Sequence, residues 1–347
     1  MENLNHKKIL VIYTGGTIGM ICKGDSYDVE KGYLTKAIEQ VSQFYAYNMP
    51  KFTIKEYDDL IDSSNINPKS WMKLSADILD HYNEYYGFVI LHGTDTLAYT
   101  ASVLSFMLGD IQKPVIVTGS QIPISQIRSD AISNILNSLI IACSDVVKEV
   151  CVYFNQQLLR GNRTTKVSAT GFDAFGSPNY PSLAIVGIDI KLKEKRLWKR
   201  CDKKLPLKVE NLEVPKIAIL SIFPGMDNQV LERFLEPPLQ GLILKTFGAG
   251  NMSDDPEIHK ALAKANERGM IIVNCTQCLH GSVKMGAYKT SEGLVGAGVI
   301  SGGDMTDEAA LGKLFYLLSQ KNVSQYEVKK AFRESLQGEI TIDSCIL

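Results

Sequence analysis

The sequence predicts an α/β fold, with a larger N-terminal domain built on a mostly parallel sheet and a smaller C-terminal α/β domain. Short apolar runs alternate with longer helical patterns, which is typical of parallel strands joined by helices. The runs are apolar at successive positions, as expected for strands that are covered on both faces. The chain also has 347 residues, more than one average domain holds.

The N-terminal half contains four predicted strands, at residues 8–13, 88–91, 115–117 and 150–154. Asn67 followed by Pro68 predicts an N-cap and a first-turn proline for a helix that continues to about residue 82. Two apolar stripes at helical spacing predict the next two helices. Their members are Leu97, Ala101, Leu104 and Leu108, and then Ile127, Ala131, Ile135 and Leu139.

A basic stretch separates the two halves. Residues 191–214 are crowded with Lys and Arg without a sustained period, which predicts a solvated linker. Beyond it we expect strands at 217–222, 241–244 and 270–273, and helices at 228–235, 255–268, 306–319 and 324–334. The predicted domains are therefore 1–190, which carries the chemistry discussed below, and 215–347, with 191–214 as the linker.

Composition and charge exclude several functional classes. The 37 Lys and Arg residues against 38 Asp and Glu give a net charge of −1, which cannot build the cationic field that binds nucleic acid. Neither a secretory signal nor an apolar run of the roughly 18 residues that a membrane span needs is present. The seven scattered cysteines are typical of a reducing compartment. We expect a cytoplasmic protein with neither a nucleic-acid nor a membrane partner.

The first motif, Thr14-Gly-Gly-Thr-Ile-Gly19, directly follows the first predicted strand, where α/β sheets bind their ligands. It does not match a dinucleotide fingerprint, because Thr14 replaces the first glycine and no helical pattern follows. Two interpretations remain: a tight turn that needs glycine, or a ligand-binding loop. The hydroxyls of Thr14 and Thr17, placed beside exposed backbone N–H groups, favour the second.

The second motif, His92-Gly-Thr-Asp-Thr96, follows the strand at 88–91 and begins a helix. Thr94 or Asp95 could serve as an ordinary N-cap. Capping needs only one such residue, whereas three polar side chains occur here in succession. We interpret His92, taken alone, as a packed or hydrogen-bonded histidine rather than a base.

Two further patches are polar: Asp62-Ser-Ser-Asn65, which precedes the Asn67 cap, and Arg160 to Lys166, which by itself resembles a basic surface loop. The sequence contains no zinc-protease, serine-hydrolase or calcium-loop motif. Cys275 and Cys278 form a lone C-x-x-C without the second pair of a zinc site, so we interpret them as a buried thiol pair at a strand end. No metal site is predicted.

The remaining residues point to acyl transfer. A threonine hydroxyl is a weak nucleophile that needs a base beside it, and a desolvated lysine can be that base. Backbone N–H groups of glycine-rich loops can stabilise the oxyanion that forms.

Together these motifs strongly resemble bacterial-type L-asparaginases. The segments 14–19 and 92–96 are similar to the two signature motifs of the family. The segments 88–96, 118–123, 160–166 and 172–175 resemble its cytoplasmic, type I branch. The resemblance runs from about residue 8 to the C-terminal helices. It implies hydrolysis of L-asparagine to L-aspartate and ammonia without metal or cofactor.

The resemblance also implies roles for individual residues. Thr14 would be the nucleophile, Tyr27 its hydrogen-bond partner on a closing lid, with Tyr33 as a rival for that role. Thr94 would be the second essential threonine, tuned by Lys166, while Asp95 would hold the α-amino group of the substrate. The implied substrate-binding residues are Asp62, Ser63, Ser64, Thr94, Asp95 and Asn251. Ser63 and Ser64 would hold the α-carboxylate. Which threonine attacks first, and which group is its base, stays open.

Asn251 lies in a segment, Phe247-Gly-Ala-Gly-Asn251, that resembles the part of the family reaching into a neighbouring subunit's active site. This implies a homodimer or homotetramer. A second, effector asparagine site of some type I enzymes would map to Thr165, Lys245 and Cys278. The related motif usually carries arginine at position 245. Because lysine cannot make the same bidentate contact with a carboxylate, allosteric control stays open.

Three alternatives are retained. The first is a dual glutaminase-asparaginase. The second is the related amidase subunit that supplies ammonia for tRNA charging, which carries an extra N-terminal domain and would need a tRNA partner. The third is a non-catalytic amino-acid-binding regulator, against which the joint presence of Thr14, Thr94, Asp95 and Lys166 argues.

Overall fold

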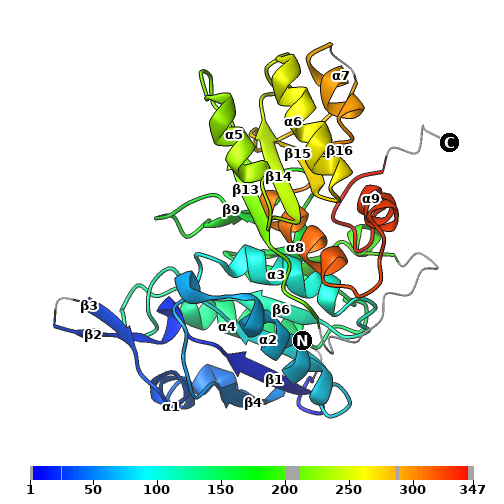
Figure 1. The fold of residues 1–347 in the computed structure, drawn as a ribbon. Helices are drawn as coiled ribbons and strands as arrows, with labels where there is room; N and C mark the ends of the chain where they lie inside the picture. The colour runs from blue at the N-terminus through cyan, green and yellow to red at the C-terminus, as the bar shows by residue number, and fades with distance from the viewer. Residues whose placement is uncertain (1–2, 25, 200–211, 287–288, 343–347) are drawn as a thin grey trace. The chain divides into compact units, whose positions relative to one another are not determined.

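The computed structural model describes residues 3–24, 26–199, 212–286 and 289–342 (Figure 1). The chain divides into two compact units, residues 1–209 and 210–347. The first residues of the predicted linker complete a strand that begins one residue earlier, β12 (Ile190–Leu192), and form a 3-10 turn, η5 (Glu194–Arg196), of the first unit. Residues 200–211 of that predicted linker lie outside the described residues. The predicted boundaries therefore stay a prediction.

In the described part of the first unit, eight strands form one sheet in the order β12-β11-β8-β7-β6-β5-β1-β4. The five strands from β7 to β4 run parallel, and the other three pair antiparallel at one edge. The bounds are β1 (Lys8–Tyr13), β4 (Lys51–Glu56), β5 (Gly87–Leu91), β6 (Val115–Thr118), β7 (Val150–Phe154), β8 (Gln157–Arg160) and β11 (Ala184–Val186). The predicted mostly parallel sheet and its four predicted strands are confirmed.

Helices cover both faces of this sheet. Alternate residues of β1 enter different cores: Ile9 and Val11 pack in the cluster that contains helices α1 and α4, and Leu10 and Ile12 in the cluster that contains α2 and α3. The helices are α1 (Tyr33–Glu39), α2 (Pro68–Asp80), α3 (Leu97–Met107) and α4 (Ala131–Ile141). Burial on both faces is the reason that the strands are apolar throughout.

The helix starts test the sequence predictions. The Asn67 side chain accepts a hydrogen bond from the Lys69 N–H at 3.0 Å, so the predicted cap is confirmed. The alternative that Thr94 or Asp95 caps α3 is wrong, because Thr96 occupies that N-cap. The inclusion of Ile127 in the stripe of α4 is also wrong, because the helix begins at Ala131 and Ile127 is fully exposed.

Several short elements complete the first unit. A two-stranded hairpin, β2 (Met20–Lys23) and β3 (Ser26–Val29), follows the first motif and extends away from the sheet (Figure 1). A second small pair is formed by β9 (Thr165–Lys166) and β10 (Phe175–Gly176). The remaining single turns are η1 (Thr17–Gly19), η2 (Ser42–Tyr45), η3 (Ser63–Asn65) and η4 (Gly161–Arg163).

The second unit has a parallel sheet of four strands among its described residues, in the order β13-β14-β15-β16. The strands are β13 (Ile217–Ser221), β14 (Gly241–Thr246), β15 (Ile271–Thr276) and β16 (Ile300–Ser301). The helices are α5 (Asn228–Leu235), α6 (Pro256–Glu267), α7 (Lys289–Gly296), α8 (Asp307–Leu318) and α9 (Gln325–Arg333). The predicted smaller α/β domain is confirmed. None of the helices in the described ranges combines the length and apolar character needed to cross a membrane.

A fully buried ion pair anchors the C-terminal part of this unit. Lys313 Nζ on α8 lies 2.6 Å from the Glu339 carboxylate, and both side chains have no exposed area. Lys313 Nζ also donates hydrogen bonds to the carbonyls of Phe332 and Glu334. The carboxylate of Glu339 accepts the backbone N–H groups of Leu336 and Gln337.

Candidate active site

The candidate site lies at the carboxyl end of the strands β4, β1 and β5, which are neighbours in the sheet. Backbone hydrogen bonds tie the loops that follow these strands to one another. The Thr14 N–H donates to the Leu91 carbonyl at 3.1 Å, and the Thr14 carbonyl accepts the Ile61 N–H at 2.8 Å. The sheet order therefore gathers three polar segments that lie far apart in the sequence.

Glycines allow these loops to approach closely. A Cβ atom on Gly16 would collide with the backbone of Gly93, and a Cβ on Gly93 would lie only 2.6 Å from Ser63 Oγ. Gly16 also has a φ of 89°, which disfavours other residues. Contact between the loops therefore requires glycine at positions 16 and 93, whether the first motif is a tight turn or a ligand-binding loop.

Thr14 is nearly inaccessible, with 2% of its surface exposed. Its Oγ1 donates a hydrogen bond to the Leu91 carbonyl at 3.1 Å. This hydrogen bond holds the hydroxyl in one orientation at the carboxyl end of β1.

Lys166 connects two of the predicted residues. Its Nζ lies 2.9 Å from Thr94 Oγ1 and 2.7 Å from Asp95 Oδ1. Thr94 is buried, the Lys166 side chain is 21% exposed and that of Asp95 is 66% exposed. The pairing of β9 with β10, in which Lys166 is opposite Phe175, fixes the lysine backbone. A lysine is thus shared between a buried hydroxyl and an accessible carboxylate.

The segment after β4 is also ordered. Asp62 Oδ1 accepts hydrogen bonds from the N–H and the hydroxyl of Ser64, both at 2.9 Å, and so caps the turn η3. Ser63 is buried, and its carbonyl accepts the Thr96 hydroxyl at 2.7 Å. Asp62 and Ser64 thus shape this segment, while Ser63 faces the glycine contact.

The structure does not bring every predicted residue together. Tyr27 lies on β3, is 52% exposed and is opposite Cys22 in the hairpin. Within the described residues its hydroxyl makes no hydrogen bond to Thr14. Tyr33, its rival, is the first residue of α1, after the αL residue Gly32.

His92 is a hydrogen-bonded core histidine, which confirms the interpretation from sequence. It has no exposed surface, and burial lowers its pKa to about 4. Its Nε2 contacts Thr100 Oγ1 at 2.9 Å, and Trp71 Nε1 donates to the same oxygen at 3.0 Å. Trp71 and Thr100 were not predicted, since both sit on buried faces of helices where nothing in the sequence separates them from packing residues.

Three of the predicted residues belong to the second unit. Asn251 forms an isolated β-bridge with Phe247. Lys245 on β14 makes an ion pair with Asp307 at 2.5 Å. Cys278 is exposed while Cys275 is buried, so the prediction of a buried thiol pair is wrong. Cys275 lies within β15, and the chain has left the sheet by Cys278. Thr165, the remaining candidate of the effector set, precedes Lys166 on β9.

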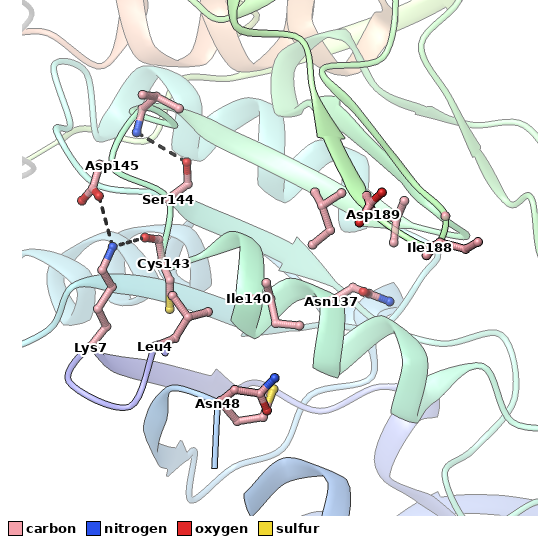
Figure 2. A pocket seen from close by; sticks show the side chains of 15 residues that line it. Leu4, Lys7, Asn48, Asn137, Ile140, Cys143, Ser144, Asp145, Ile188 and Asp189 are labelled. Atoms are coloured by element: carbon pink, nitrogen blue, oxygen red, sulfur yellow. Dashed lines mark hydrogen bonds and ion pairs between the residues drawn. The ribbon is translucent and has the colours of Figure 1, made fainter. Parts of the chain in front are cut away.

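A cavity of about 660 Å³ in the first unit lies away from this site (Figure 2). Its walls include Lys7 before β1, Asn48 before β4 and the turn between β11 and β12, so it lies toward the amino end of the strands. The buried ammonium of Lys7 already donates to the Cys143 carbonyl at 2.7 Å and to Asp145 at 3.2 Å. Within the described ranges, no three His, Cys, Asp or Glu side chains group as metal ligands.

The fold and the site agree with one enzyme class, and comparison with known families settles the membership. The chain belongs to the asparaginase family: residues 8–198 match "Asparaginase, N-terminal" and residues 216–332 match "Glutaminase/Asparaginase C-terminal domain". The predicted resemblance to the type I branch is confirmed.

Among individual proteins, the chain is 46% identical over 340 residues to L-asparaginase 1 of Escherichia coli K12, covering 98% of this chain and all of that one. It is 41% identical to the 60 kDa lysophospholipase of Mus musculus, covering 97% of this chain and 63% of that protein. The crystal structure of L-asparaginase I from Vibrio cholerae superposes with a TM-score of 0.87 at 47% identity, covering 97% and 99% of the two chains.

Proposed function

We propose that this chain hydrolyses the side-chain amide of L-asparagine to L-aspartate and ammonia. The observation that carries the proposal is the position of Lys166 Nζ between Thr94 Oγ1 and Asp95 Oδ1, on loops in direct contact with the loop of Thr14. Family membership and the E. coli relative's name support asparagine as the substrate.

The proposed reaction has two halves. The Thr14 hydroxyl turns away from the Leu91 carbonyl and Thr14 Oγ1 attacks the amide carbon. Its proton passes through the Thr94 hydroxyl to Lys166, which accepts it as the uncharged amine, and the pair returns a proton to the departing nitrogen, which leaves as ammonia. Water then cleaves the threonine ester and releases aspartate. The Thr94 N–H has no hydrogen-bond partner in the described part of the chain, so it is a donor available to the oxyanion.

Substrate recognition follows from the charges of an α-amino acid. The exposed carboxylate of Asp95 would hold the α-ammonium group, and the Asp62–Ser64 segment would supply donors for the α-carboxylate. Tyr27 would reach Thr14 only after the β2–β3 hairpin closes over the bound substrate, which excludes water.

The same proposal includes a cytoplasmic enzyme that assembles as a homodimer or homotetramer and lends Asn251 to a neighbouring subunit. Within the second unit, the ion pair between Lys245 and Asp307 satisfies the lysine that the resemblance assigns to an effector site. Hyperbolic saturation by asparagine would argue against such an effector site.

The deciding experiment measures ammonia release from L-asparagine and from L-glutamine by the wild type, Thr14→Ala and Thr94→Ala. We expect activity on asparagine, much weaker activity on glutamine, and a loss of about 10³-fold or more in kcat for either variant. Comparable rates on both amides would favour the dual glutaminase-asparaginase. Full activity of Thr14→Ala would refute its role as nucleophile, and inactivity of a folded wild type would favour the binding regulator.

A further inference from the structure

Behind the loop of Thr94 lies a chain of three buried polar side chains. Trp71 on α2 donates from Nε1 to Thr100 Oγ1 on α3 at 3.0 Å. Thr100 Oγ1 contacts His92 Nε2 at 2.9 Å, and His92 Nδ1 lies 2.7 Å from the carbonyl oxygen of Gly93. Trp71 is 8% exposed and the other two side chains have no exposed surface. We call Trp71, Thr100 and His92 the relay.

The direction of every hydrogen bond in the relay is fixed by chemistry. A carbonyl only accepts, so His92 Nδ1 must carry a proton. A neutral imidazole has one proton, which leaves Nε2 as an acceptor, so Thr100 must donate its only hydrogen to Nε2. Trp71 Nε1–H can only donate, and it fills the acceptor side of the same hydroxyl. The relay therefore admits a single arrangement of protons.

The relay ends on the peptide that precedes Thr94. A peptide unit is planar and trans, so its C=O and N–H point in opposite directions. Because His92 Nδ1 holds the Gly93 carbonyl toward the core, the N–H of Thr94 points away from the core. The backbone of Gly93 is also pressed against Gly16 and Ser63, so this peptide has little freedom to rotate.

We infer that Trp71, Thr100 and His92 are positioning residues, which hold the Gly93–Thr94 peptide so that the Thr94 N–H faces the reacting carbonyl and Thr94 Oγ1 stays at Lys166. This inference rests on the proposed function for its effect on turnover. Its structural part, the proton arrangement of the relay, stands independently of the substrate. None of the three side chains contacts substrate directly in this scheme.

The first test needs no substitution. The chain has five histidines, and long-range ¹H–¹⁵N spectra of the purified protein report which ring nitrogen of each is protonated. His92→Gln assigns the resonance by its disappearance. We expect the Nδ1–H tautomer, unchanged between pH 6 and pH 8. The Nε2–H tautomer, or an imidazolium in that range, would overturn the relay.

The second test separates hydrogen bonding from packing at position 100. Thr100→Val keeps the shape and removes the hydroxyl, whereas Thr100→Ser keeps the hydroxyl and removes a methyl group. We expect Thr100→Val to lower kcat for asparagine roughly 10- to 100-fold with KM within about threefold of the wild type, and Thr100→Ser to recover most of the loss. A role in packing alone predicts the reverse order of the two variants.

If Thr100→Val does not fold, Thr100→Cys replaces it, because a thiol of similar size is a weak donor. Unchanged kcat in a folded Thr100→Val or Thr100→Cys protein, or no recovery in Thr100→Ser, would refute the positioning role. A wild type that shows the Nδ1–H tautomer but no amidase activity would instead refute the proposed function and leave the relay intact.

Discussion

Two lysine–carboxylate pairs in this chain have similar geometry and opposite surroundings. Lys166 and Asp95 are 2.7 Å apart in the candidate site, and Lys313 and Glu339 are 2.6 Å apart in the second unit. The Asp95 side chain is 66% exposed, whereas neither side chain of the second pair has exposed surface. Distance alone therefore does not distinguish Lys166, which we propose acts in the reaction, from Lys313, which stabilises the fold.

The two lysines are distinguished by the other contacts that each of them makes. Lys313 donates to two backbone carbonyls besides Glu339, so its three donors are used and it cannot exchange a partner. Lys166 contacts one hydroxyl and one solvated carboxylate, both of which can turn to a substrate. We therefore expect substitution of Lys166 to lower the enzymatic activity and substitution of Lys313 to lower the stability of the fold.

The largest effect is expected for Lys166→Met. Removing the proposed proton acceptor should lower kcat on asparagine by about 10²–10⁴-fold. The melting temperature should change little, because a solvated pair contributes only about 0.2–1 kcal/mol. Lys55→Met is the matched control, since Lys55 on β4 of the same unit pairs with Asp77 on α2 at 2.5 Å. Equal losses of activity in both variants would mean that Lys166 has no particular role.

The next effect is expected for Lys313→Met, measured as the free energy of unfolding. Leaving Glu339 buried without its cation should cost about 3–5 kcal/mol, while kcat per folded molecule stays unchanged. The double variant Lys313→Met, Glu339→Leu should regain much of this loss, because it removes both charges. A Lys313→Met protein as stable as the wild type would show that the buried pair contributes little to stability, and would contradict the structural role of Lys313.

The smallest effect is expected for His92, a buried ionisable side chain that stays uncharged instead of forming an ion pair. The pKa of His92 is lowered from 6.5 to about 4, so between these values the unfolded chain binds a proton that the folded chain does not. Stability should therefore fall as the pH falls through this window. Between pH 7 and pH 5 the wild type should lose about 2 kcal/mol more than His92→Gln in urea unfolding. Parallel losses in the two proteins would show that His92 titrates normally.

The fold was largely predictable because long, apolar elements carry strong local patterns. The strands at 8–13 and 150–154 and the helix at 228–235 have the predicted bounds. The short elements β2, β3 and β8 to β12 were not predicted, since two to four residues carry no period. The prediction that Ile127 belongs to α4 was wrong for a related reason: one apolar residue at the right spacing does not extend a helix whose N-cap is Asp130.

The candidate site was predictable where motifs are contiguous and not where it depends on packing. Thr94 and Asp95 were found by their motif, and their contact with Lys166, 72 positions beyond Thr94, required the resemblance. Trp71 and Thr100 could not be found, because their importance lies in hydrogen bonds between two helices rather than in any local pattern. Cys278 was misjudged because the end of β15 falls between the two cysteines.

The close approach of Gly15, Gly16 and Gly93 to neighbouring backbone has a consequence for protein engineering. Built Cβ atoms at these positions meet the backbone of Ile61, the backbone of Gly93 and the side chain of Ser63. A saturation library at these three positions should therefore consist almost entirely of inactive clones. Tyr27 on the β2–β3 hairpin is exposed instead, so substitutions there should be tolerated far more often than at the three glycines, and the two regions should accumulate substitutions at very different rates.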